Sequence, residues 1–351
     1  MSWDIAFILS TDGIATGAIY LLAGIGLVLI FSVTRVVFVP FGDIAAFAAL
    51  SLAAFETDRL PPTIGLVLIL AALALLAEIV GHVRQHRFAQ IPKAILVWGA
   101  LPVLPCALAW VVFASHAPGW LRVIAAIALV VPIAPLLARL TLQPIADASV
   151  LVLLIVSLAL HFLLSGLGLL FFGPEGSRTH PLVDATWTIA PGYSIGGQTL
   201  LMVASALVLS GLFFLFFEHT VTGKALRATA VNRVGARLVG IRPKKTAMLA
   251  YTGASLLAGL VGVLIAPVTT MYYDSGFILG LKAFIAAIVG GLVSYPVTAL
   301  GALGVGIFES FASFWSGEMK DVLVFSLLIP VLLLRSWLAA HADDDEEEID
   351  E

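Results

Sequence analysis

Charge is scarce in this sequence, and its scarcity decides the class of protein. Only 11% of the 351 residues are charged, whereas 61% are hydrophobic and the mean hydropathy is +1.09. This composition excludes a water-soluble domain, because so much apolar surface cannot be hydrated without a large cost in free energy. Apolar runs of about 20 residues, enough to cross a hydrocarbon core of about 30 Å, recur from end to end. We therefore predict a polytopic membrane protein.

Cysteine and common catalytic motifs are also scarce. The single cysteine, Cys106, lies in the apolar run 104–110, so the chain alone can build neither a disulfide framework nor a cysteine metal site. The sequence has no HExxH motif and no phosphate-binding GxxxxGKS/T loop. We therefore expect no catalytic residues, no metal and no cofactor in this chain. No lysine or arginine precedes Arg35, so the positively charged start of a signal peptide is missing, and we expect the first helix to be retained.

The acidic residues are unevenly distributed. The formal net charge is −4, but residues 343–351 hold eight of the 22 acids, which leaves 14 acids against 18 basic residues elsewhere. A terminal block of like charges is typical of a solvated, disordered segment, with docking to a partner as the alternative. We predict one transmembrane permease domain over residues 1–340 and an acidic disordered tail over 341–351.

The apolar runs predict an all-α transmembrane helix bundle. Two of the runs, 37–55 and 277–293, are short enough to be broken or partly re-entrant helices, so the count is ten or eleven. The eleven candidate spans are 12–34, 37–55, 63–80, 94–114, 120–138, 149–172, 197–218, 246–268, 277–293, 297–315 and 321–338.

The basic residues predict how this bundle is oriented. The connection 219–245 carries seven lysines and arginines, which marks its side as cytoplasmic by the positive-inside rule. With eleven spans, 13 of the 18 basic residues then face the cytoplasm, including Arg335. This arrangement places the N-terminus outside and the C-terminus inside. The loop 172–197 becomes the largest external segment and could contact a partner.

Four ionisable residues within the spans are candidates for a translocation path: Asp43, His161, Lys282 and Glu309. Charge in hydrocarbon is costly and is therefore often functional. Each has a structural alternative. Lys282 could extend its amine to the outer surface, Asp43 could cap a helix start, and His161 and Glu309 could bond neighbouring helices. Glu78, near the cytoplasmic end of its span, is expected to be solvated beside His82 and Arg84.

The basic connection 219–245 is amphipathic as well as charged. Apolar residues at helical spacing alternate with arginines on both sides of Gly235. This pattern suits a helix that lies along the inner membrane surface. Either anionic lipid holds the helix there, or the helix docks into a groove of a cytoplasmic ATPase; composition alone leaves both interpretations open.

Several motifs resemble the branched-chain amino-acid ABC transporter permease family, the Liv type. They cover about two thirds of the chain and are densest after residue 223. The matching segments are Gly13-Ile-Ala-Thr-Gly-Ala-Ile-Tyr20, Phe41-Gly-Asp43, Phe171-Phe-Gly-Pro174, Gly223-Lys-Ala-Leu-Arg-Ala-Thr-Ala230, Gly235-Ala-Arg-Leu-Val-Gly-Ile241, Lys282-Ala-Phe-Ile-Ala-Ala-Ile-Val-Gly-Gly291 with Ser294 and Pro296, Gly306-Ile-Phe-Glu-Ser310 and Lys320-Asp-Val-Leu-Val-Phe325.

Two departures from the family pattern affect what the resemblance implies. Where the family usually reads Asn-Phe-Ala-His-Gly followed by Asp or Glu, this chain has Phe38-Val-Pro-Phe-Gly-Asp43, so an Asn and a His are absent. Substrate identity therefore stays open between branched-chain amino acids, the family expectation, and urea, amides or other carboxylates. The region 78–118 is also longer than in the family, which an extra span explains.

The resemblance implies an importer in the bacterial inner membrane, with the N-terminus periplasmic and the C-terminus cytoplasmic. Two permease subunits, identical or different, would pair in the lipid; two cytoplasmic ATPase subunits would use the ATP; and a periplasmic binding protein would deliver the solute. Nucleic acid has no place in this scheme. The residues implied to couple the ATPase are Gly223, Lys224, Arg227, Ala228, Gly240 and Ile241.

A self-sufficient secondary transporter or channel is the alternative from another class. Such a protein binds its solute near the middle of the membrane and needs no ATPase. His161 or Glu309 would then have to bind the solute directly, whereas the importer leaves most of the specificity to the binding protein.

Overall fold

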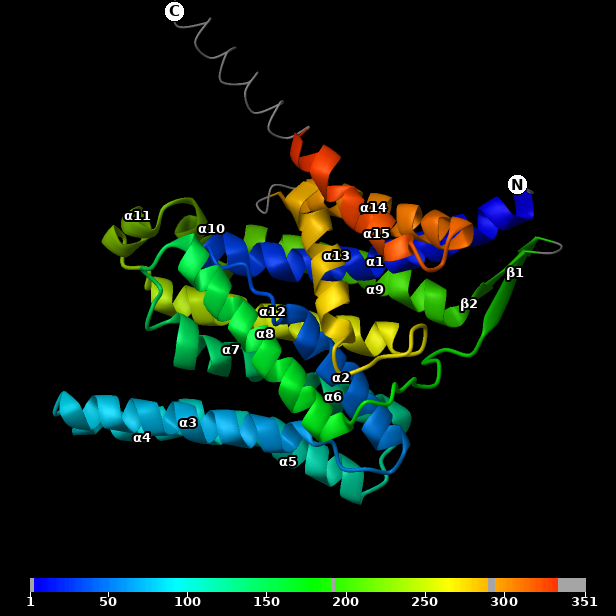
Figure 1. The fold of residues 1–351 in the computed structure, drawn as a ribbon. Helices are drawn as coiled ribbons and strands as arrows, with labels where there is room; N and C mark the ends of the chain where they lie inside the picture. Colours follow the sequence, from blue (N-terminus) through cyan, green and yellow to red (C-terminus); the bar gives the residue numbers. More distant parts are fainter. Residues whose placement is uncertain (1–2, 191–192, 290–293, 334–351) are drawn as a thin grey trace, which may run out of the picture.

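The fold is an all-α bundle with one small β-hairpin, seen in a computed structural model that describes residues 3–190, 193–289 and 294–333 (Figure 1). Eight helices in this part of the chain are long and apolar enough to cross a membrane, which confirms a polytopic membrane fold. The elements are α1 (Trp3–Thr34), α2 (Phe41–Glu56), α3 (Thr63–Arg84), η1 (Phe88–Gln90), α4 (Ile91–Ala94), η2 (Ile95–Ala100), α5 (Leu101–Ala114), α6 (Gly119–Val130), α7 (Ile133–Leu137), η3 (Ala138–Leu142), α8 (Val150–Phe172), β1 (Thr186–Ala190), β2 (Tyr193–Gly196), α9 (Gly197–His219), α10 (Val221–Val231), α11 (Arg233–Leu238), α12 (Pro243–Ile265), α13 (Ser275–Val289), α14 (Tyr295–Trp315) and α15 (Lys320–Ser326).

The first ten predicted spans coincide with helices, although several boundaries differ. Two of these helices are short, as the runs indicated: α2 has 16 residues, and α13 has 15 up to Val289, where the described range ends. The predicted eleventh span, 321–338, begins as α15, which ends at Ser326. After a turn at Leu327, residues 328–333 are again helical. The rest of this span, with Arg335, and the acidic tail 341–351 lie outside the described residues.

Helix α2 is the centre of the bundle. Every residue from Phe41 to Phe55 is buried, and α2 packs mainly on α12, α13 and α6. Glycines let the backbones meet there: a Cβ at Gly42 would lie 1.8 Å from the carbonyl oxygen of Gly276, and one at Gly262 would lie 2.0 Å from that of Ala45. Small residues at helix contacts are the usual way to pack helices tightly in a membrane.

Residues 35–40 form a non-helical segment inside the bundle. Val36 and Phe38 are buried, and the backbone N–H of Val39 donates to Ser157 Oγ on α8 at 2.9 Å. Non-helical backbone at membrane depth is tolerated where protein covers it and supplies hydrogen bonds. The predicted span 37–55 was therefore wrong at its start, because the helix begins only after Pro40.

Helices α1 and α14 lie side by side in Figure 1 and pack backbone against backbone. A Cβ added to Gly306 would come within 2.4 Å of Gly17 Cα, and one added to Gly13 within 2.6 Å of Ile307 Cα. No side chain separates the two helices at these points. The pair therefore depends on glycine at all three positions.

The segment 63–114 forms a peripheral hairpin of α3 and the composite helix that ends in α5 (Figure 1). Its exposed apolar side chains, such as Leu76 and Leu104, suit contact with lipid. Arg139 Nε on η3 donates to Glu78 Oε1 at 2.7 Å, and the guanidinium lies 5.9 Å from the Trp98 ring centroid. The expectation of a solvated Glu78 was therefore wrong, because its side chain is only 15% exposed and pairs with Arg139. His82 lies beside it as expected, with Nε2 3.7 Å from Glu78 Oε2.

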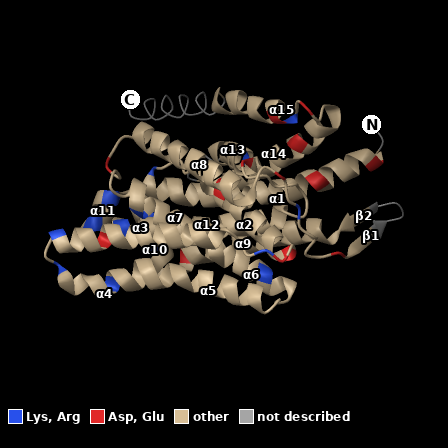
Figure 2. Ribbon diagram, turned by 60° about the horizontal axis from the view of Figure 1, so that its bottom comes forward, with Lys and Arg blue, Asp and Glu red and all other residues tan. Residues whose placement is uncertain are grey.

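The two ends of the bundle differ in charge. Figure 2 shows lysines and arginines gathered around α10, α11 and the turn between α3 and α4, whereas the β-hairpin lies at the opposite end. This separation agrees with the pattern expected from the positive-inside rule. The loop 172–197 contains ordered contacts in its described part: β1 and β2 pair antiparallel, and Ser177 forms an isolated bridge with Met271.

Candidate functional site

A cavity of about 440 Å³ lies between α1, α9, α12, α13, α14 and α15. It contains charges of both signs, hydroxyl groups and an apolar wall. The charged lining residues are Asp12, Lys282, Glu309, Lys320 and Asp321. The hydroxyl-bearing lining residues are Thr16, Tyr20, Thr269, Ser275, Ser310 and Ser313.

An ion-pair network lines one part of this cavity. Lys282 Nζ donates to Glu309 Oε1 at 2.5 Å and lies 2.8 Å from Asp321 Oδ1, and Tyr20 donates its hydroxyl to Glu309 Oε2. The contact with Asp321 is an ion pair without the alignment of a hydrogen bond. The Lys282 side chain is only 6% exposed, so it does not extend to the surface. A buried ammonium needs such partners, because an unpaired charge in low dielectric is very costly.

Ser310 follows Glu309 on α14 and lines the same cavity. The residue is 6% exposed, and within the described ranges its hydroxyl oxygen makes no hydrogen bond. Buried polar groups are nearly always paired, so an unpaired one needs an explanation.

A second buried pair lies apart from the cavity. His161 Nδ1 on α8 is 2.8 Å from Asp43 Oδ2 and 3.0 Å from Oδ1, and the imidazole stacks on Phe277 with ring centroids 4.6 Å apart. The side chains of Asp43 and His161 are 1% and 7% exposed. The helix-capping expectation for Asp43 was therefore wrong, because its carboxylate contacts His161 on another helix.

The structure thus divides the four predicted path residues into two pairs, Lys282 with Glu309 and Asp43 with His161. Tyr20, Ser310 and Asp321 were missed. Depth was a usable signal for the first pair, since Lys282 lies about two turns after the start of α13 and Glu309 about two turns before the end of α14. Opposite charges at equal depth on antiparallel neighbours should meet.

The basic connection forms two short helices, α10 and α11, rather than one continuous helix. Thr220 Oγ1 caps α10 by accepting from Gly223 N at 2.9 Å, and Asn232 Oδ1 caps α11 by accepting from Val234 N and Gly235 N at 3.0 and 2.9 Å. Such caps satisfy amides that a helix start leaves free. Leu226 is buried, whereas Leu238 and Val239 are exposed.

The six predicted coupling residues differ in their surroundings. Lys224, Arg227 and Gly240 are exposed, Ala228 and Ile241 are half-buried, and Gly223 is buried. At both glycine positions, Gly223 and Gly240, the backbone itself favours glycine. A Cβ at Gly223 would lie 2.2 Å from the Phe216 carbonyl oxygen, and Gly240 has φ +85°, a conformation that favours glycine after a helix. Arg227 pairs with Glu218 at 2.9 Å.

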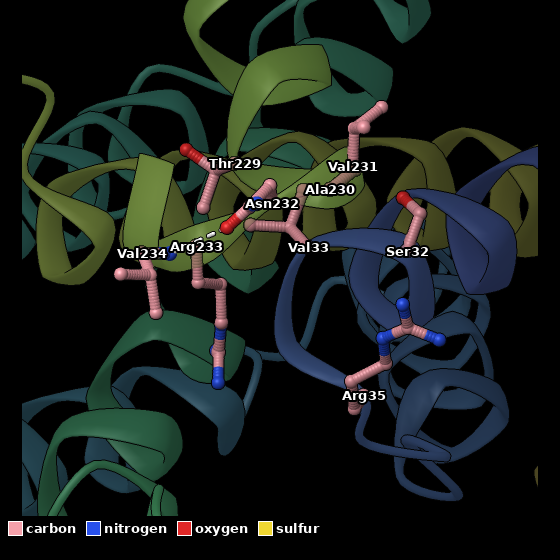
Figure 3. Close-up of a pocket in the computed structure, with 9 residues that line it drawn as sticks. All are labelled: Ser32, Val33, Arg35, Thr229, Ala230, Val231, Asn232, Arg233 and Val234. Carbon is pink, nitrogen blue, oxygen red and sulfur yellow. Dashed lines mark hydrogen bonds between the residues drawn. The ribbon is translucent and has the colours of Figure 1, made fainter. Parts of the chain in front are cut away.

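A pocket of about 220 Å³ separates the end of α1 from the junction of α10 and α11. Figure 3 shows Arg35 and Arg233 among its lining residues, on opposite elements. Arg233 Nε is buried and, in the part of the chain that the structure describes, has no hydrogen-bond partner. Beside this pocket, α10 packs against α1.

The external loop also contains a Gly-Tyr-Ser-Ile-Gly stretch over residues 192–196, which matches the letters of the GxSxG serine motif. The motif requires its serine on a sharp turn between a strand and a helix. Ser194 lies within β2, so the match lacks that context.

Comparison with known proteins places this architecture among transport permeases. The family described as branched-chain amino acid transport system permease component matches residues 9–332. The high-affinity branched-chain amino acid permease LivH of Escherichia coli K12 is 30% identical over 228 residues, which are 62% of this chain and 73% of the relative. BraD of Pseudomonas aeruginosa is 38% identical over 144 residues, 39% and 45% of the two chains. No solved structure matches this chain.

Proposed function

Since this chain belongs to the family of branched-chain amino acid transport system permease components, we propose that it imports amino acids or related small polar solutes as the membrane subunit of an ATP-driven transporter. The match extends over nearly all of the described residues, so the transport permease assignment applies to the whole bundle. The proposal adds the partners, the solute class and the source of energy.

The surface of α10 and α11 is the observation that supports docking of an ATPase. Val231, Leu238 and Val239 are 82%, 83% and 75% exposed, within a segment that also exposes arginines and lysines. Apolar side chains that are so exposed beside the membrane, mixed with positive charge, suit a partner with an apolar groove and an acidic rim. The chain itself would bind no nucleotide.

The contacts of α10 connect this surface mechanically to other helices of the bundle. Gly223 brings α10 against the end of α9, and Thr246 Oγ1 on α12 donates to Thr229 Oγ1 at 3.2 Å. Helix α10 also packs against α1, beside the pocket lined by Arg35 and Arg233. A displacement of α10 by closing ATPases would therefore act on α1, α9 and α12 together, as expected for a switch between two packed states.

The remaining partners follow from the same scheme. A second permease subunit, identical or different, would complete the pathway across the inner membrane. A periplasmic binding protein would dock at the opposite end, where the β-hairpin lies. In this orientation the N-terminus is periplasmic and the C-terminus cytoplasmic.

The test is recovery of the ATPase from native membranes. We expect the doubly substituted chain Leu238→Glu with Val239→Glu to insert normally and to lose the ATPase, because both side chains would carry charge into an apolar contact. Arg87→Glu, in the turn after α3 at the same end of the bundle, is the control and should keep the ATPase.

Affinity purification with mass spectrometry measures recovery of the ATPase. Uptake of radiolabelled L-leucine measures transport, which should be lost together with the ATPase. Equal recovery of ATPase with the double variant would refute the docking surface. A chain that recovers no ATPase even in its natural form would favour the self-sufficient transporter instead.

A further inference from the structure

We propose that the pocket between the end of α1 and the junction of α10 and α11 binds a phosphate ester, which Arg35 and Arg233 hold between them (Figure 3). The position of the pocket favours the headgroup of an anionic phospholipid over a soluble phosphate as the source. This ligand would be a bound component of the permease rather than a solute that it transports.

The lining of the pocket carries positive charge without any acid. It includes Arg35 and Arg233 but no Asp or Glu, so its formal charge is +2. In the described part of the chain, the arginines that form ion pairs are Arg122, Arg139 and Arg227. Arg233 Nε is also buried there without a hydrogen-bond partner. Like charges repel, and a buried charged group is costly unless it is paired, so the pocket calls for an anion.

The side-chain hydrogens that remain for a ligand belong to nitrogen atoms. The hydroxyls of Ser32 and Thr229 donate to carbonyl oxygens one turn earlier in their own helices, at 3.2 and 2.8 Å. Asn232 uses its Oδ1 to cap α11, which leaves its side-chain NH₂ as a donor. Together with the two guanidinium groups, this amide suits a ligand that only accepts hydrogen bonds.

The backbone of Arg35 is a second, independent observation. Arg35 directly follows α1 and has φ +61°, a left-handed conformation that is usual for glycine after a helix. An L-residue with a long side chain adopts this conformation only at a cost. The chain therefore keeps an arginine beside the pocket where the backbone favours glycine.

The chemistry and size of the pocket fit a phosphate group. Guanidinium groups present two parallel N–H donors that match phosphate oxygens, which makes arginine the preferred residue for such contacts. The volume of about 220 Å³ is smaller than the range of about 300–1,000 Å³ that is usual for drug-sized ligands. It therefore suits a headgroup rather than a large solute.

The place of the pocket in the fold favours a lipid. It lies where the apolar helix α1 ends, at the end of the bundle where Figure 2 shows the basic residues gathered. Basic pockets between membrane helices are typical sites for anionic headgroups. Val33, Ala230 and Val234 add an apolar wall that can cover the glycerol part of such a lipid.

Native mass spectrometry of the purified chain, titrated with phosphatidylglycerol or phosphatidylcholine in detergent without ATPase, tests the proposal. We expect the natural chain to bind phosphatidylglycerol at least about tenfold more tightly than the double variant Arg35→Gln with Arg233→Gln. Arg84→Gln with Arg87→Gln removes the same charge at the same end of the bundle, from exposed residues outside the pocket. This control should bind the lipid like the natural chain.

A second arm distinguishes a lipid from a soluble source. Glycerol 3-phosphate is added to the chain in phosphatidylcholine nanodiscs, and broadening of its phosphorus NMR line measures binding. Retention of phosphatidylglycerol without such broadening assigns the phosphate to a lipid. Broadening that the pocket variant abolishes and the control keeps assigns it to a soluble ester.

The pocket variant should fold normally, because neither guanidinium pairs with an acid of the described residues. Its thermal unfolding in phosphatidylcholine nanodiscs, compared with that of the natural chain, checks this point. The lysine pair, Arg35→Lys with Arg233→Lys, keeps both charges without the planar fork and should bind phosphatidylglycerol with intermediate strength.

Absence of phosphate binding in both arms would overturn the proposal and leave the pocket to an acidic group of a protein partner. Equal weakening by the pocket variant and the control would also overturn it, because charge alone would then explain the attraction. Neither arm uses an ATPase or a transported solute. The outcome is therefore separate from ATPase recovery, which tests the proposed function.

Discussion

The two buried ion pairs of this protein differ in how completely their surroundings satisfy them. Asp43 and His161 are enclosed, both carboxylate oxygens lie within 3.0 Å of Nδ1, and Phe277 covers the ring. Lys282 and Glu309 instead face a cavity with a further carboxylate and an unpaired hydroxyl. An ionisable side chain within a membrane helix is therefore not sufficient to mark a function. A polar group that lines a cavity and has no hydrogen-bond partner is a better indication of function.

Breaking the enclosed pair should have the largest effect on stability. Asp43→Ala would leave the His161 imidazole buried without its partner, and we expect the free energy of unfolding to fall by about 3 kcal/mol. Asp43→Asn, which keeps an acceptor, should cost less than half as much. Unfolding in mixed SDS micelles measures both, and natural stability of Asp43→Ala would show that the pair is dispensable.

The second largest loss of stability is expected at the backbone contact between Gly42 and Gly276, beside that pair. A Cβ at Gly42 would lie 1.8 Å from the Gly276 carbonyl oxygen, so Gly42→Ala must push α2 from α13 and should cost about 2 kcal/mol. Gly166 on α8 has nothing within 4 Å of the corresponding position and serves as the control. Equal unfolding midpoints for Gly42→Ala and Gly166→Ala would contradict the close approach.

The open pair should respond differently to the loss of one charge. Glu309→Gln leaves Lys282 paired with Asp321, and the new amide oxygen can still accept from Tyr20. We therefore expect a loss below about 1 kcal/mol in the same unfolding measurement. A loss of stability as large as that of Asp43→Ala would erase the distinction between the pairs.

The smallest expected difference in stability is between alanine variants of two serines, Ser310 and Ser51. Ser310→Ala should change stability by less than about 0.5 kcal/mol, because its hydroxyl has no partner among the described residues. Ser51→Ala removes a buried hydrogen bond to Thr63 Oγ1, 2.7 Å long, and should cost about 1 kcal/mol. Thermal unfolding of the two variants side by side decides the point, and equal losses would count against an unpaired Ser310.

Much of the fold could be predicted from the apolar runs, because the bilayer sets the length that a helix needs. The late start of α2 was missed, although Pro40 held a signal: the residue before a proline favours extended backbone. The β-hairpin in the loop 172–197 was also missed, since the loop was read only from its prolines and glycines.

The candidate site was only partly predictable. Lys282 and Glu309 stood out because charge is rare in apolar runs, but their contact required the depth of each residue in its helix. Tyr20 and Ser310 carry no such mark, since neither side chain is charged. Asp43 and His161 are 118 positions apart in sequence, and only the packing of α2 on α8 brings them together.

The glycine contacts between α1 and α14 have a mechanical consequence. With Gly17 and Gly306 in backbone contact, we expect α1 and α14 to move together as one rigid unit. Tyr20 and Glu309 both belong to this unit, whereas Lys282 belongs to α13. A movement of the unit relative to α13 would therefore change the distance between Lys282 and Glu309 and leave the hydrogen bond between Tyr20 and Glu309 intact.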